Sequence, residues 1–113
     1  MDFQLSEDQL AIQRAVEAVC SDFDEHYWLA RDRDGEFPHQ FHAALARAGW
    51  LGVAMPSTYG GAGLGITEAA LMMETIARSG AGMSGASAVH MNIFGLHPAV
   101  VFGNDDQKHR WLP

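Results

Sequence analysis

The sequence predicts an all-α protein, a bundle of about five to six helices in one domain over residues 1–113. Three observations lead to this prediction. Apolar residues recur at helical spacing, capping residues begin or end most of the segments, and no segment alternates apolar and polar residues as a half-buried strand does. The length is enough for a domain with a core of its own.

The first helix is predicted over residues 7–31. Ser6 and Gln9 have the spacing of a capping box, in which each side chain bonds the backbone amide of the other residue. Cys20 lies beside the apolar face and is expected in the core. The apolar residues that share this face are Ile12, Val16, Val19, Phe23 and Tyr27.

A turn over residues 31–36 precedes a short helix over residues 38–48. Pro38 suits the first position of this helix, and Gly49 suits the position after its end. Residues 49–65 hold six of the twelve glycines, which predicts an irregular connection. The residues expected to be buried in the short helix are Phe41, Ala44 and Leu45.

The second half of the chain predicts four more helices. One begins after Thr67 as its N-cap, ends near Ser79 and is apolar nearly all round, as in a central helix. The next covers residues 82–94 and is rich in small residues, which permit close helix contact or the close approach of a ligand. Two short helices over residues 98–102 and 105–112 follow, the last capped by Asn104 or Asp105.

The charge pattern excludes several kinds of partner. Fourteen acidic and seven basic residues give a net charge of -7, all of it carried by residues 1–36. Without a cluster of Lys and Arg, neither nucleic acid nor an anionic membrane is an expected partner. One cysteine excludes a disulfide framework, and the acidic start lacks the apolar stretch of a signal peptide, so a cytoplasmic location is expected. Residues 79–104 are uncharged but broken by Gly, His, Asn and Pro, which favours buried helices over a membrane span.

Few residues offer chemistry of their own. The glycines of residues 60–65 lack the spacing of a nucleotide loop, so a structural turn is expected there. His39 and His42 share a helix face without a third ligand, and no metal site is expected. Glu74 is a weak candidate for a catalytic base, because an exposed pair with Arg78 explains it better.

Two histidines, His90 and His97, lie in the uncharged segment. The commoner explanation for such residues is a hydrogen-bonded core histidine, and the alternative is a contact with a ligand.

Four patterns in the same order resemble those of the acyl-CoA dehydrogenase family. Residues 3–9 resemble the usual start of its members, and Phe37-Pro38 and Leu51-Gly52 fall where members have them. The other two patterns are Pro56-Ser57-Thr58-Tyr59-Gly60-Gly61-Ala62-Gly63, which is similar to the family's P-x-x-Y-G-G-x-G loop, and Gly103-Asn104-Asp105-Asp106-Gln107-Lys108 with Trp111-Leu112-Pro113.

The resemblance covers only the N-terminal α-helical domain of that family. Members continue with a middle β-barrel and a C-terminal four-helix domain, which hold most of the FAD and the catalytic glutamate. The resemblance therefore implies no catalytic residue in this chain and no FAD site in it alone. It implies an oxidoreductase of fatty acid metabolism, in which a base removes the α proton of an acyl-CoA thioester and the flavin takes the β hydride. Electron-transfer flavoprotein and a homodimer or homotetramer are the implied partners.

By the same resemblance, residues 84–95 line the acyl chain, and small residues there leave space for it. Four residues with the spacing of one helix face are assigned to this wall: Ser87, His90, Met91 and Phe94. For His90 the alternative is a core histidine bonded to a neighbouring backbone carbonyl.

Two other functions stay open at this point. Flavin monooxygenases, nitroalkane oxidases and DNA-damage-associated members share this domain, and a stand-alone helical interaction module would have no catalysis. A domain severed from its enzyme should expose an apolar patch. Candidates for that surface, with ordinary core as an equal alternative, are Trp50, Leu51, Val53, Met55, Trp111 and Leu112.

Overall fold

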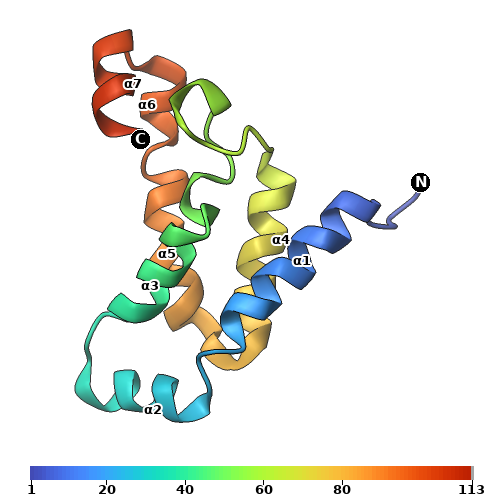
Figure 1. Cartoon of the computed structure of the whole chain (residues 1–113), viewed down its shortest axis with the longest axis vertical. Coiled ribbons are helices and arrows are strands. Elements are labelled where there is room, and N and C mark those ends of the chain that lie inside the picture. Colours follow the sequence, from blue (N-terminus) through green and yellow to red (C-terminus); the bar gives the residue numbers. More distant parts are fainter. Residues whose placement is uncertain (113) are drawn as a thin grey trace.

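The computed structural model describes residues 1–112, and over these residues it is all-α, as predicted (Figure 1). Short 3-10 turns lie at Trp50–Gly52 and Ser57–Tyr59, and a π-helical turn at Ala77–Ala81. Pro113, the last residue of the fourth motif, lies outside the described residues. The helices are α1 (Glu7–Cys20), α2 (Glu25–Asp34), α3 (His39–Arg47), α4 (Ile66–Ile76), α5 (Gly82–Phe94), α6 (His97–Phe102) and α7 (Asp105–Trp111).

The described residues form seven α-helices rather than five or six, because the predicted first helix is two. Its start is confirmed, since Ser6 and Gln9 form the capping box. The prediction of one helix to residue 31 was wrong: a turn follows α1, and the Asp24 carboxylate accepts a hydrogen bond from the Tyr27 amide and begins α2. Periodicity missed this break because Phe23 and Tyr27 reach the core on both sides of it.

The start of α4 also differs from the prediction. Its N-cap is Gly65, not Thr67, and the Glu68 carboxylate accepts a hydrogen bond from the Gly65 amide at 3.0 Å. The regular helix ends at Ile76, and one wider turn follows up to Gly80, whose φ of 103° breaks the helix, so the end predicted near Ser79 is confirmed. Pro38 similarly caps α3 from outside rather than filling its first turn.

The core lies between α1, α3, α4 and α5. Helix α4 packs against α1 on one side and α5 on the other, and α3 contacts both α1 and α5. In Figure 1 α6 and α7 lie at the opposite end of the molecule from α2. Fully buried residues at the centre are Val16, Phe41, Leu45, Val53, Met72, Thr75, Ile76 and Val89, and Cys20 joins them as predicted.

Of the residues predicted for the exposed apolar patch of a severed domain, some are buried and others exposed. Val53 and Met55 are buried, so ordinary core is the correct reading for them. Trp50 and Leu51 are partly buried and pack against the core. At the other end of the chain, Leu112 is buried while Trp111 is 47% exposed.

Candidate functional site

Helix α5 has one face in the core and the other toward solvent. The residues that face the core are Gly85, Ala86, Ala88, Val89 and Ile93. On the other face Ser87 is exposed, His90 is half-buried, Met91 is 63% exposed and Phe94 is 43% exposed. The four residues assigned from the resemblance therefore share a helix face that the rest of the described chain leaves open. Below, this face is called the α5 wall.

Met83 extends the α5 wall by one turn, although sequence reasoning did not single it out. It is 77% exposed and stands four residues before Ser87. That spacing places Met83 on the same face as Ser87, and the spacing could have identified Met83 from the sequence.

Gly85, one of the small residues of α5, serves helix packing. A Cβ built on Gly85 would lie 2.5 Å from Ala81 Cβ and 2.9 Å from Ile76 Cγ2. Contacts that short show that α5 can approach its neighbours only because residue 85 has no side chain. Of the two roles expected for the small residues, Gly85 has that of close helix contact, and space for a ligand beside the exposed Ser84 and Ser87 stays a prediction.

Neither predicted core histidine is in the core. His97 is exposed, and the His90 ring is half-buried on the α5 wall. The predicted bond to a neighbouring carbonyl is present, because His90 Nδ1 lies 2.9 Å from the backbone oxygen of Ser87. The carbonyl one turn earlier on the same helix supplies the hydrogen-bond partner of Nδ1, so the ring needs no partner from the core.

Phe94 forms part of a small apolar cavity at the end of the wall. The cavity has a volume of about 380 Å³. Ile66 is 62% exposed and Leu64 is 40% exposed at its rim, so the apolar surface continues from α5 onto the start of α4. Its lining residues are Ala54, Leu64, Gly65, Ile66, Ile93, Phe94 and His97.

A side-chain hydrogen bond connects α5 to α3 on the side of α5 away from the wall. His42 Nε2 lies 3.0 Å from Asn92 Oδ1. The other predicted member of the histidine pair, His39, points its ring toward Phe37 at 5.0 Å between centroids. Over residues 1–112 no three His, Cys, Asp or Glu side chains come together as metal ligands.

In the glycine loop before α4, residues 60–65, the backbone amides are used in hydrogen bonds of the protein and are not free for a phosphate. The amides of Gly60 and Gly61 donate to the carbonyls of Ser57 and Pro56, at 3.0 and 3.1 Å. Those of residues 62–64 donate to other carbonyls of the loop region, and that of Gly65 to Glu68. A phosphate cradle needs free amides, so this loop is the structural turn that its spacing predicts.

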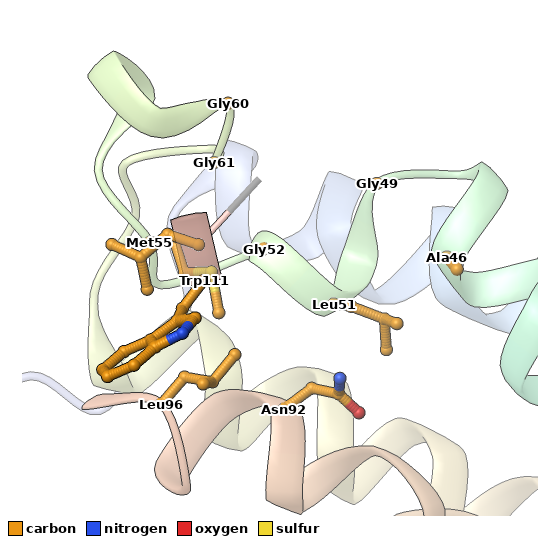
Figure 2. Close-up of a pocket in the computed structure, with 11 residues that line it drawn as sticks. Ala46, Gly49, Leu51, Gly52, Met55, Gly60, Gly61, Asn92, Leu96 and Trp111 are labelled. Atoms are coloured by element: carbon orange, nitrogen blue, oxygen red, sulfur yellow. The ribbon is translucent and has the colours of Figure 1, made fainter. Parts of the chain in front are cut away.

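A second cavity of about 340 Å³ lies between this loop and α5. Figure 2 shows Met55, Leu96 and Trp111 gathered at one end of it, and Leu51 and Asn92 at the other. It lies on the side of α5 that faces α3 and the 3-10 turn Trp50–Gly52, away from the α5 wall.

Two arginines of the helical bundle are paired with carboxylates. Arg31 lies 3.6 Å from Asp34 and 3.8 Å from Glu36, while Arg78 bonds Glu17 at 2.8 Å instead of the predicted Glu74. Glu74 is exposed on α4. Burial raises the pKa of the Cys20 thiol, which fits a core residue and not a nucleophile.

Comparison with known proteins gives a match over nearly the whole chain. The family described as "Acyl-CoA dehydrogenase, N-terminal domain" matches residues 6–113. The acyl-CoA dehydrogenase FadE12 of Mycobacterium tuberculosis is 35% identical over 111 residues, which are 96% of this chain and 27% of that protein. No solved structure matches.

Two further relatives have more specific names. Mitochondrial isovaleryl-CoA dehydrogenase of Pongo abelii is 32% identical over 96% of this chain and 26% of its own length. Benzylmalonyl-CoA dehydrogenase of Aromatoleum aromaticum is 30% identical over 97% of this chain and 29% of its own length. The chain thus spans about a quarter of the length of the curated relatives it matches.

Proposed function

The chain belongs to the acyl-CoA dehydrogenase family as an N-terminal domain, and from that premise we propose that its α5 wall forms one side of the acyl cavity in an FAD-dependent acyl-CoA dehydrogenase. The wall consists of Met83, Ser87, His90, Met91 and Phe94. The larger enzyme removes two hydrogens from the α and β carbons of an acyl-CoA thioester. In this proposal the partners of the chain are the other domains of the enzyme, electron-transfer flavoprotein and further copies of the same subunit.

The one-sided exposure of α5 is the observation that carries this proposal. Large apolar side chains on a helix that is closed on its other face are stabilised when something apolar covers them. Met91 at 63% and Phe94 at 43% exposure offer such a surface on a face that contains no charged residue. An acyl chain between this wall and the rest of the enzyme has the matching chemistry.

The glycine loop does not form a site for the diphosphate of FAD. A diphosphate needs free amides, whereas the amides of this loop are occupied by backbone carbonyls and by Glu68. The described residues therefore supply no step that involves the flavin. Their part in the reaction is to orient the acyl chain and to keep water from it.

The proposed domain organisation is tested by the mass of the protein in its native cells. We expect roughly four times 12.3 kDa, because the chain spans 27% of the mycobacterial relative. A native mass of 12.3 kDa would contradict it and would favour a stand-alone module.

The wall itself is tested by Phe94→Ala in the enzyme that contains this chain. Removing the ring should raise kcat/KM for longer or branched acyl-CoA relative to short ones by about ten-fold, because an apolar pocket discriminates by volume. The control is Phe102→Ala on α6, whose side chain is 85% exposed outside the wall. A chain-length profile unchanged by Phe94→Ala would exclude this residue from the cavity.

A further inference from the structure

We propose that the α5 wall selects acyl groups that carry a hydroxyl, with His90 Nε2 as the hydrogen-bond acceptor. The inference rests on the proposed function and names the class of substrate for the same site.

The hydrogen bond of the His90 ring fixes which nitrogen carries the proton. Nδ1 lies 2.9 Å from the backbone oxygen of Ser87. A carbonyl oxygen only accepts hydrogen bonds, so the Nδ1 of a neutral ring must be the donor and its Nε2 must be an acceptor. Within residues 1–112 this Nε2 makes no hydrogen bond.

On the side toward Phe94 the surroundings of this acceptor are apolar, and on the other side Ser87 precedes it by one turn. Met91 and Phe94 follow His90 on the exposed face, and Met83 precedes it by two turns. Helix α5 contains no Asp, Glu, Lys or Arg. The wall therefore presents two polar groups, the Ser87 hydroxyl and the free lone pair of His90 Nε2, and the latter lies about 6 Å along the helix from Phe94 on the apolar end of the wall.

An acyl chain that covers the wall would remove water from Nε2. If the acyl chain offers no donor, the covered lone pair loses its hydrogen bond to water without replacement, which weakens the binding of that substrate. A hydroxyl on the chain donates to Nε2 while its methylenes contact Met91 and Phe94. A carboxylate has no proton to donate to a neutral ring, so a hydroxyl is the matching group.

The test uses the enzyme that contains this chain, with octanoyl-CoA and its monohydroxylated isomers beyond the β carbon as probes. We expect kcat/KM for the best hydroxylated isomer to exceed that for octanoyl-CoA by about ten-fold. His90→Phe keeps a ring but no acceptor and should abolish the preference. His90→Gln keeps an acceptor and should restore part of it.

A matched control is His109→Phe on α7. His109 makes the same local bond, from Nδ1 to the Asp105 oxygen at 2.8 Å, but lies outside the wall. It should leave the preference unchanged. The inference is overturned if the wild-type enzyme oxidises octanoyl-CoA as well as every hydroxylated isomer, or if His90→Phe keeps the preference. Failure to oxidise any of the thioesters would instead overturn the proposed function on which the inference rests.

Discussion

Gly85 is a residue at which α5 packs closely against its neighbours. Besides Ala81 and Ile76, the Trp28 ring lies 3.4 Å from where its Cβ would be. Trp28 is itself buried and packs edge-on against Phe41. A methyl group at position 85 would therefore push against Ala81 and Ile76 and touch Trp28, and a closely packed core yields little.

Gly85→Ala should lower the free energy of unfolding by about 1–3 kcal/mol, as overpacking does, despite the better helix propensity of alanine. Urea unfolding followed by circular dichroism measures the loss. Ser84→Ala, at the adjacent exposed position, is the matched control and should be neutral or slightly stabilising. Equal stability of the two variants would contradict this account of α5 packing.

The His90 ring illustrates how one residue is predicted only in part. Its bond to a backbone oxygen one turn away could be expected from the sequence, because it needs only local helix geometry. Its exposure could not, because the burial of a residue depends on which helix face meets the core.

At the scale of elements, Glu68 connects the start of α4 to α1. Its carboxylate accepts hydrogen bonds from the Gly65 amide and from Gln9 Nε2, each at 3.0 Å. The bond from Gln9, with those from the backbone, lowers the pKa of Glu68 below its ordinary value of 4.5. The same Gln9 completes the capping box of α1, so two helix starts share one side chain.

The lowered pKa sets the direction of a pH dependence. A carboxylate with a depressed pKa in the folded state stabilises the fold fully above its unfolded pKa, and this stabilisation is lost as pH falls through the folded pKa. Glu68→Gln should therefore lower the melting temperature at pH 7, and the difference from wild type should shrink as the pH falls below about 4.5. Thermal unfolding monitored by circular dichroism measures both.

The exposed Glu74→Gln on the same helix is the control and should show neither change. A difference between Glu68→Gln and wild type that stayed constant down to pH 3 would mean that the Glu68 hydrogen bonds do not support the fold.

At the scale of the whole molecule, the described chain leaves apolar surface uncovered on one side of α5 and at the start of α4. Met83 is 77% exposed, Met91 63% and Ile66 62%. Between residues 1 and 112 no helix is long and apolar enough to span a bilayer. This surface is the one that we propose the acyl chain and the other domains cover.

The isolated 113-residue chain should self-associate through this surface, since contiguous apolar surface of this kind is normally buried. Sedimentation velocity at increasing concentration should show the association, and Met83→Lys with Met91→Lys should reduce it. Phe3→Lys, at an exposed residue before α1, should not. A wild-type chain that stays monomeric throughout would favour a stand-alone module.

The sequence by itself determined the helical class, the cap at Ser6, the bounds of α5 and the family. These depend on local spacing, capping chemistry and motif order, which are written along the chain. Only the tertiary structure decided that Val53 is core, that Gly85 serves packing and that His90 faces outward. Each of these depends on which side of a helix meets another helix, and spacing along the chain does not specify that contact.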